Sequence, residues 1–491
     1  MTGSSETHNT TNVVHGIRLR CSECAISMHV VATPPPSVCP YCKRKLDRTA
    51  TAIPLAEPFP APDATEVEAR IGKLYSRPNV VVALLIGAVA LLLLSWAVFL
   101  QIRNADNYYY QPLVSIYSLL AGTFVVSRFL FAAFYSPPPD VGYTPSVTVL
   151  VPCMNEEAVI RQTIERIFSA GYPQDRLEVV CVNDGSSDDT LREMLKAQTR
   201  HPRLVVVDFE KNRGLCHAWG VAMMLARGEF VVCVDSDTFI FPGSLNKLVQ
   251  GFVDPTVGGI SGHCDVENAN ANLLTRMQDV RYYFSYKIMK ASESIFGTVS
   301  CLPGCFSAYR RICVLAVLED WMNATVMGVH GNYADDRSLT NRILKNYNII
   351  YDDTALATTI APESWKQYTR QQARWMRSYL REIIRTGRFI WRKHPVPAIS
   401  WYAMMWLPLV EPFVMLQALL IGPLMAQTFR ADYTLGVLSI TLVWSLHFLA
   451  TTGRRWWWGG ITFTMSYIAF YSWQIYWALF TLRGRKWGTR G

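Results

Sequence analysis

The chain has 491 residues, of which 50% are hydrophobic and only 17% are charged. This composition is too apolar for an ordinary soluble protein of this length, so we expect a membrane-embedded portion. The net charge is +9, and residues 362–491 carry most of the excess, with 16 Lys/Arg against 4 Asp/Glu. Because the excess lies beside apolar stretches, it favours contact with anionic lipid and argues against a nucleic-acid partner.

Residues 1–50 are expected to form a cytosolic tail with a zinc-ribbon-like segment. The first 20 residues lack the basic start, apolar run and small-residue cleavage site of a signal peptide. Two paired-thiol motifs follow at nearly the separation of a zinc ribbon, with Cys21, Cys24, Cys39 and Cys42. Four thiolates suit one tetrahedral Zn²⁺ and leave no open position for catalysis, so its role would be structural or partner-binding. The alternative is four reduced or disulfide-bonded cysteines in a tail.

Two long apolar runs follow a linker rich in Pro and Ala at residues 51–78. Each run is long enough to cross a bilayer, and together they predict a transmembrane hairpin over residues 79–135. Seven Lys/Arg lie between residue 43 and the first run, whereas the loop between the runs carries only Arg103. Since basic residues favour the inner side, this pattern predicts a multi-pass plasma-membrane protein whose N-terminus and central domain are cytosolic.

Residues 136–362 are predicted to form a cytosolic α/β domain. Strand-like apolar runs occur at residues 147–151, 177–182, 204–208 and 230–234. They alternate with helical patterns such as residues 157–169 and 188–198. This alternation predicts a mostly parallel, doubly wound sheet that binds ligands at the carboxyl ends of its strands.

Acidic motifs follow two of these strands. Asp184 lies in an Asn-Asp-Gly-Ser turn after the second strand, where its carboxylate can accept hydrogen bonds from a uracil or a ribose, although the same motif is common as a turn or helix N-cap. Asp235 and Asp237 follow the fourth strand. This pair can hold one hard divalent ion, Mg²⁺ or Mn²⁺, with positions open for a diphosphate.

From residue 363 the pattern becomes helical. Arginine recurs at steps of three or four residues along one helix face, at Arg370, Arg374, Arg377, Arg381, Arg385, Arg388 and Arg392. We expect residues 363–397 to be an amphipathic helical region at the cytosolic membrane surface, although a solvated charged face gives the same pattern.

Residues 398–482 contain three further apolar stretches that are compatible with transmembrane channel helices. Three crossings would place the basic tail, residues 483–491, outside the cell, against the positive-inside rule. One stretch is therefore expected to be interfacial or folded as a tight hairpin, and Glu411-Pro412 and Gly459-Gly460 are candidate breaks.

Four motifs occur in order along the chain, namely VNDGSSDDT, DSDT, ADDR and QQARW. In this order, and flanked by apolar spans, they resemble the processive family 2 glycosyltransferases, the membrane synthases of hyaluronan, chitin and cellulose. The resemblance covers about residues 76–491. It implies a nucleotide-sugar transferase domain of the type A glycosyltransferase fold, inserted between transmembrane helices.

The resemblance implies a role for each acidic motif. Asp184 would bind the uridine, Asp235 would position the nucleotide, and Asp237 would ligate Mg²⁺ or Mn²⁺. Asp336 would be the general base that takes the proton of the acceptor hydroxyl. Without the family, an N-cap or an ion pair with Arg337 would explain Asp336 equally well.

The resemblance also implies roles for basic and aromatic residues. Arg374 would pair with the diphosphate, and Trp375, with Gln371 beside it in the motif, would contact the acceptor sugar. Lys211 and Arg213 are further candidates for phosphate binding, or else are surface charges. In the basic tail, the segment with Trp487 and Arg490 would close over the nucleotide site.

The details point to two products within this family. The segments ADDRSLTNRIL and QQARWMRSYLRE and the final WGTR are most like hyaluronan synthases, whereas ESIFGTVSCLPGCFSAYR resembles chitin synthases. We expect an inverting synthase that polymerises UDP-GlcNAc and UDP-GlcA into hyaluronan and translocates the growing polysaccharide. Chitin or a chitin oligosaccharide, from UDP-GlcNAc alone, is the alternative. Less favoured hypotheses are single transfer to a lipid carrier and a non-catalytic membrane scaffold.

Overall fold

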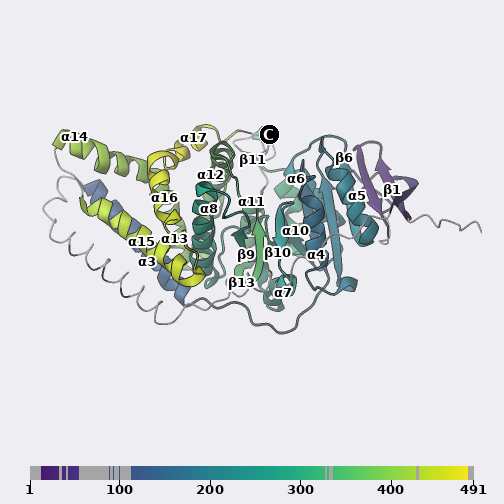
Figure 1. Ribbon diagram of the computed structural model, residues 1–491, viewed down its shortest axis with the longest axis horizontal. Coiled ribbons are helices and arrows are strands. Elements are labelled where there is room, and N and C mark those ends of the chain that lie inside the picture. The colour runs from purple at the N-terminus through teal and green to yellow at the C-terminus, as the bar shows by residue number, and fades with distance from the viewer. Residues whose placement is uncertain are drawn as a thin grey trace, which may run out of the picture.

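The computed structural model describes residues 13–31, 36–39, 42–54, 112–326, 329–330, 335–426 and 431–484, together with four isolated positions between 88 and 99. The first apolar run at residues 79–102 lies almost wholly outside the described residues, as do most of the linker, Trp487 and Arg490. A central α/β domain lies between a block of helices at one end and a small three-stranded unit at the other (Figure 1).

An eleven-stranded sheet forms the core, in the order β3-β1-β2-β6-β5-β4-β7-β10-β9-β13-β8. Its centre consists of four parallel strands, β4 (Val147–Cys153), β5 (Leu177–Asn183), β6 (Leu204–Phe209) and β7 (Phe230–Cys233). These strands are buried almost throughout, as continuous Val-rich runs covered on both faces require. All four strands predicted from the apolar runs are confirmed.

The prediction of a mostly parallel sheet is wrong outside this centre. β10 (Ser307–Arg310) runs antiparallel to both β7 and β9 (Val257–Val266), and β8 (Thr238–Ile240) runs antiparallel to β13 (Asn348–Thr359). β9 and β13 are parallel to each other. β8 and β10 are too short to show a period in the sequence, so their direction depends on the longer strands that they join.

The N-terminal segment extends the same sheet and differs in this respect from the separate tail expected above. β1 (Val13–Cys21) pairs antiparallel with β2 (Ile26–Val30) and β3 (Asp47–Pro54). β2 in turn pairs antiparallel with β6 at the edge of the parallel centre. This pairing covers a strand edge whose backbone groups would otherwise lack partners.

Helices cover the faces of the sheet. In the central domain they are α4 (Ile160–Phe168), α5 (Thr190–Arg200), α6 (Leu215–Leu225), α7 (Ser244–Val249), α10 (Arg311–Met322) and α11 (Asp336–Leu344). Short elements complete it, namely η2 (Gln174–Arg176), η3 (Gln250–Val253) and the hairpin of β11 (Thr325–Val326) and β12 (Val329–His330). The helices predicted at residues 157–169 and 188–198 correspond to α4 and α5.

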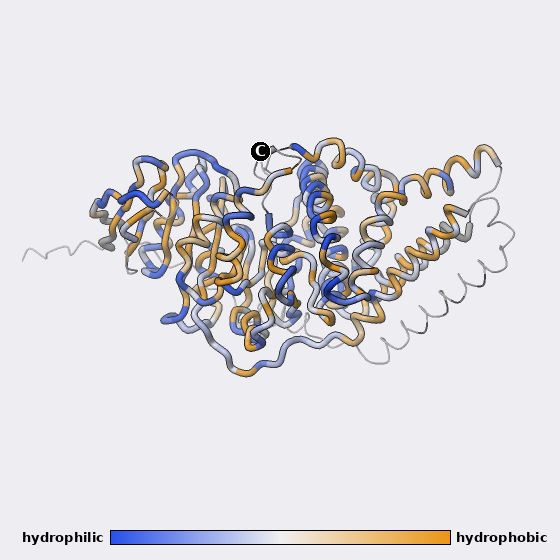
Figure 2. Tube along the Cα trace, turned by 180° about the vertical axis from the view of Figure 1, so that it is seen from behind, coloured by the Kyte–Doolittle hydropathy of each residue, from blue (hydrophilic) through white to orange (hydrophobic). Residues whose placement is uncertain are grey.

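The helical block contains the remaining elements. They are α3 (Pro112–Ala133), α8 (Leu273–Tyr283), η4 (Phe284–Lys290), α9 (Ala291–Ser294), α12 (Trp365–Gly387), η5 (Ile390–Arg392), α13 (Pro395–Leu416), η6 (Gln417–Ile421), α14 (Gly422–Ala426), α15 (Ala431–Thr452), α16 (Gly459–Ser466), η7 (Tyr467–Tyr471) and α17 (Gln474–Phe480). Among the described residues, two helices are long and apolar enough to cross a membrane, Leu113–Ala133 and Pro395–Met425. Apolar residues dominate the far end of the block, where α3, α14 and α15 lie (Figures 1 and 2).

The last apolar stretch is interrupted and returns to α12. α16 begins at Gly459, one of the candidate breaks, and the π-helical turn η7 separates it from α17. The Gln474 side chain donates to the Thr369 carbonyl of α12 at 3.1 Å. This part of the chain therefore packs along α12.

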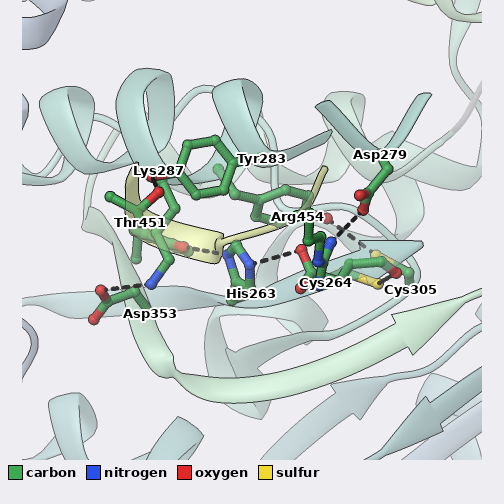
Figure 3. Close-up of polar contacts among 12 residues, drawn as sticks. His263, Cys264, Asp279, Tyr283, Lys287, Cys305, Asp353, Thr451 and Arg454 are labelled. Carbon is green, nitrogen blue, oxygen red and sulfur yellow. Dashed lines mark hydrogen bonds and ion pairs between the residues drawn. The ribbon is translucent and has the colours of Figure 1, made fainter. Parts of the chain in front are cut away.

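A buried charge network joins the helical block to the sheet (Figure 3). Arg454, just after α15, contacts Asp279 of α8 at 2.6 Å and Asp265 of β9 at 3.0 Å. His263 contacts the other oxygen of Asp265 at 3.1 Å, and Trp456 donates to Asp279 at 2.8 Å. Burial raises the pKa of Asp279 to about 6, against the effect of Arg454. Although burial opposes its ionisation as well, Arg454 and His263 hold the pKa of Asp265 well below its usual range.

Arg454→Ala is expected to destabilise the protein by about 3–5 kcal/mol at pH 7, because it leaves two buried carboxylates without their cation. The measurement is the melting temperature of the detergent-purified protein, with exposed Arg455→Ala as the matched control. The loss should be smaller at pH 5, where protonation neutralises the unpaired carboxylates. Equal melting temperatures for the two variants would contradict this role of Arg454.

Candidate active site

Asp184 is buried at the carboxyl end of β5 and is held by a neighbouring loop. Its two oxygens accept the backbone N–H groups of Arg213 at 2.7 Å and Gly214 at 2.9 Å. Burial raises the pKa of Asp184, although both hydrogen bonds favour the charged form. Gly185 has a φ of +69°, and a Cβ there would lie 2.4 Å from the Asn212 nitrogen. The turn and the loop thus approach too closely for a side chain at residue 185.

Asp235 and Asp237 lie between β7 and β8. The Thr359 hydroxyl donates to Asp237 at 3.2 Å, and the Thr163 hydroxyl donates to the Ser236 carbonyl at 2.6 Å, which fixes the backbone between the two acids. Burial, together with the charges of Asp237 and Asp336, raises the pKa of Asp235 to about 7. Two carboxylates on one short turn are hard oxygen ligands that suit Mg²⁺ or Mn²⁺.

The acidic pair at the start of α11 is divided between two positions. Asp335 is the N-cap, since its carboxylate accepts the Ser338 N–H at 2.8 Å in a capping box. Asp336 instead accepts the Gly304 N–H at 3.2 Å and the Arg337 N–H at 2.7 Å. The N-cap that the sequence suggested for Asp336 is therefore formed by Asp335.

Gly304 lies between the two acidic groups and was not singled out from the sequence. Its N–H binds Asp336, and a Cβ on Gly304 would lie 2.9 Å from the Asp235 carboxylate and 3.0 Å from the Trp219 ring. This packing brings the turn after β7 next to the start of α11. In the sequence Gly304 is part of a Leu-Pro-Gly turn, and none of these three residue types has a side chain that takes part in catalysis.

Helix α12 supplies the basic and aromatic groups. The Ser364 side chain caps its N-terminus by accepting the Gln367 N–H at 3.3 Å. Burial lowers the pKa of Arg374, against the charges of Asp336, Asp235 and Asp335. Arg374 therefore lies within electrostatic range of the acidic cluster of Asp235, Asp237 and Asp336.

Two other predicted residues of α12 lie close to Arg374 in the helix. Trp375 is 37% exposed, and the Arg281 guanidinium lies over its ring at 5.6 Å. Gln371 is half-buried, and its side-chain oxygen accepts from Gln372 at 3.4 Å.

The two basic candidates before α6 differ in their placement. Lys211 is exposed. The Arg213 guanidinium donates to the carbonyl of Cys24 in the N-terminal unit and lies over the Phe209 ring at 5.5 Å. Arg213 therefore contributes its backbone N–H to the hydrogen bonds that hold Asp184, in addition to the positive charge of its side chain.

The four N-terminal cysteines come together as expected from their spacing. The Sγ atoms of Cys21, Cys24, Cys39 and Cys42 all lie within 4.8 Å of one another, and the residues are free thiols. The cluster lies in the β1–β3 unit, apart from the acidic cluster. It could hold a metal ion but, with four protein ligands, would leave no position for a substrate.

Comparisons with known proteins identify the family of the central domain. Residues 148–315 match the family described as Glycosyl transferase family 2. The chain carries a family 2 glycosyltransferase domain. This match covers the parallel centre of the sheet, Asp184, Asp235, Asp237 and Gly304, whereas Asp336 and Arg374 lie beyond it.

Among curated proteins, the chain is similar to a hyaluronan synthase of Streptococcus pyogenes, 32% identical over 277 residues, which are 55% of this chain and 66% of the relative. It is also 31% identical over 286 residues to an N-acetylglucosaminyltransferase of Bradyrhizobium diazoefficiens, covering 56% of this chain and 59% of that protein. The chain therefore spans about two thirds or less of the length of these relatives.

A solved structure supports the fold. A mannosyltransferase from Pyrobaculum calidifontis, in complex with GDP-Man and Mn²⁺, has a TM-score of 0.52 and 23% sequence identity, over 72% of this chain and 98% of that one. Its likeness confirms the expected type A glycosyltransferase fold of the central domain.

Gly304→Ala is expected to reduce glycosyl transfer by about 10- to 100-fold, because the added Cβ must displace the Asp235 carboxylate or the Trp219 ring. The matched control is Gly387→Ala, where a Cβ meets nothing closer than 3.7 Å. Initial rates and melting temperatures of both variants would be measured. A wild-type rate for Gly304→Ala would show that the close packing of Asp235 and Asp336 at Gly304 does not matter for turnover.

Proposed function

We propose that the protein is a membrane-embedded, processive, inverting glycosyltransferase that polymerises UDP-GlcNAc and UDP-GlcA into hyaluronan. The observation that carries this proposal is the convergence of Asp235, Asp237, Asp336 and Arg374 beside a block of apolar helices. Similarity to the streptococcal hyaluronan synthase supports this product over others.

The acidic cluster suits transfer of a sugar from a nucleoside diphosphate. Asp237 and Asp235 would hold Mg²⁺ or Mn²⁺, which would supply charge to neutralise the departing diphosphate. Arg374 would add a bidentate donor for the same phosphates. The solved mannosyltransferase with GDP-Man and Mn²⁺ is a precedent for a divalent ion on this fold. The Asp184 carboxylate would bind the uridine at the neighbouring strand end.

Asp336 is the candidate general base. Its carboxylate is held by the Gly304 N–H and lies among the groups that would bind the donor. Accepting the proton of the acceptor hydroxyl would let that oxygen attack the anomeric carbon as the UDP leaves, with inversion in a single displacement. No covalent intermediate is required.

Helix α12 would connect the chemistry to the membrane. Arg374 lies within electrostatic range of the acidic cluster, while Trp375 exposes part of its ring and would stack on the acceptor sugar with Gln371 nearby. The Arg381 guanidinium donates to the carbonyls of Leu482 and Gly484 at 2.7 and 3.1 Å. The chain therefore lies beside α12 up to Gly484, and the segment with Trp487 and Arg490 that follows would close over the nucleotide site.

In the membrane, α3 and the helix Pro395–Met425 would form part of the path along which the polymer leaves. The helical block lies at the end of the molecule away from the N-terminal unit, which would leave the central domain outside the membrane (Figure 1). The basic residues before the first apolar run favour the cytosolic side for this domain. Anionic lipid would contact the exposed parts of the arginine side chains along α12.

Chitin or a chitin oligosaccharide is the second candidate product. It is favoured by the similarity to the rhizobial N-acetylglucosaminyltransferase and needs only UDP-GlcNAc. The two products are distinguished by UDP release and polymer formation with each donor alone and with both, in Mn²⁺ or Mg²⁺. We expect polymer only with both donors, degradable by hyaluronidase. Sustained polymerisation of UDP-GlcNAc alone would replace hyaluronan with chitin.

Asp336→Asn is expected to lower the rate by at least about 100-fold, since it removes the base. Asp335→Asn is the matched control, because Asn is an equally good N-cap and preserves the hydrogen bond to Ser338. It should retain most of the activity. A larger loss in Asp335→Asn than in Asp336→Asn would exchange the roles assigned to the two residues.

A further inference from the structure

The N-terminal cysteine cluster is not used by the proposed transferase chemistry. The Sγ atoms of Cys21 and Cys42 are 3.5 Å apart, and all four lie within 4.8 Å of one another. Zinc bonds of about 2.3 Å in a tetrahedral thiolate site place the sulfurs about 3.8 Å apart. A disulfide requires about 2.05 Å. The spacing therefore fits four ligands of one ion and not two disulfides.

The residue that follows each cysteine pair has the same unusual backbone conformation. Ala25 and Lys43 each directly follow the second cysteine of a pair, and their φ angles are 49° and 64°. Residues with a Cβ rarely adopt this left-handed backbone. In the first turn the Cys24 N–H also points to the Cys21 sulfur at 3.5 Å. Two residues with the same strained backbone, each next to a thiol of the cluster, are explained by a shared ion that holds the two pairs together.

The cluster is docked firmly on the transferase domain. Main-chain pairing joins Ile26 to Phe209 and His29 to Val206 between β2 and β6. The Gln198 side chain of α5 donates to the His29 carbonyl at 2.7 Å. The cluster cysteines Cys21, Cys24 and Cys39 are buried in the same hydrophobic core as the central sheet. The unit thus belongs to the domain and is not a tethered module.

The turn at Cys24 contacts the loop that holds Asp184. The carbonyl of Cys24 accepts a hydrogen bond from the Arg213 guanidinium. The backbone N–H groups of Arg213 and Gly214 bind the two oxygens of Asp184. A change in the turn at Cys24 would therefore move the loop that holds the Asp184 carboxylate.

We propose that Cys21, Cys24, Cys39 and Cys42 bind one structural Zn²⁺, and that this site sets the affinity for the donor nucleotide through the Cys24 carbonyl and Arg213. Arg213 is a positioning residue in this scheme, since its side chain acts through the loop that holds Asp184. The second part of the proposal rests on the proposed function, whereas the metal site does not.

The metal site is tested on the full-length protein in detergent by plasma mass spectrometry. We expect about one zinc per chain in the wild type and in Cys313→Ser, a cysteine outside the cluster. Cys42→Ser, which changes the least buried ligand, should lose the zinc. Protein produced with Co²⁺ should show the absorption of a tetrahedral cobalt thiolate. No stoichiometric metal, iron in place of zinc, or zinc retained by Cys42→Ser would overturn the site.

The coupling is tested by UDP binding calorimetry and by donor kinetics on the same proteins. Cys42→Ser and Arg213→Ala should each raise the UDP Kd and the donor KM by about tenfold, with kcat within about twofold. Arg213→Ala should keep its zinc, and Arg213→Lys should restore part of the affinity. The double variant should bind UDP no more weakly than either single variant, because both substitutions act through the contact between Arg213 and the Cys24 carbonyl.

Additive losses, or an unchanged Kd in zinc-free Cys42→Ser, would overturn the coupling. Loss of a structural zinc is expected to lower the melting temperature of Cys42→Ser below that of Cys313→Ser, so binding and kinetics are measured below the onset of unfolding of each variant. If the wild type binds no UDP, the proposed function fails and the coupling fails with it, while the zinc measurement still decides the metal site.

Discussion

The concentration of carboxylates beside Arg374 and Arg337 is the constraint on which the rest of the structure depends. Asp235, Asp237 and Asp336 repel one another, and this repulsion together with burial raises the pKa of Asp235 to about 7. Arg374 supplies one positive charge against them. Such a site has a deficit of positive charge, which a divalent cation removes. A cation held there can in turn bind a diphosphate. Strain of this kind is tolerated only where the surrounding elements are firmly held.

Several elements hold the cluster, and they come from distant parts of the chain. The turn after β7 and the start of α11 meet at Gly304, where the absence of a Cβ permits the approach. Helix α12 brings Arg374 from the helical block. Arg454 then fixes that block to the sheet by joining Asp279 of α8 to Asp265 of β9. The charge network of Arg454, Asp279 and Asp265 therefore connects the transferase domain to the apolar helices.

The sequence was sufficient for those features that depend on local pattern. The apolar runs predicted β4 to β7, and acids that follow parallel strands had to meet at one edge of the sheet. Features that depend on distant pairing were missed. Gly304 has no chemistry of its own, the four-residue strand β10 has no period, and the docking of β2 on β6 joins segments almost 180 residues apart. The division between Asp335 and Asp336 depends on how the chain enters α11, which the pair of letters does not show.

The central claim is that this acidic cluster binds the metal and the diphosphate of the donor. The most direct measurement is a cryo-electron microscopy map of the full-length protein with UDP and Mn²⁺. We expect the ion at about 2.1 Å from an Asp237 oxygen, with the diphosphate between the ion and Arg374 and the uracil near Asp184. An ion and nucleotide bound away from Asp235 and Asp237, with Arg374 free of the phosphates, would contradict it.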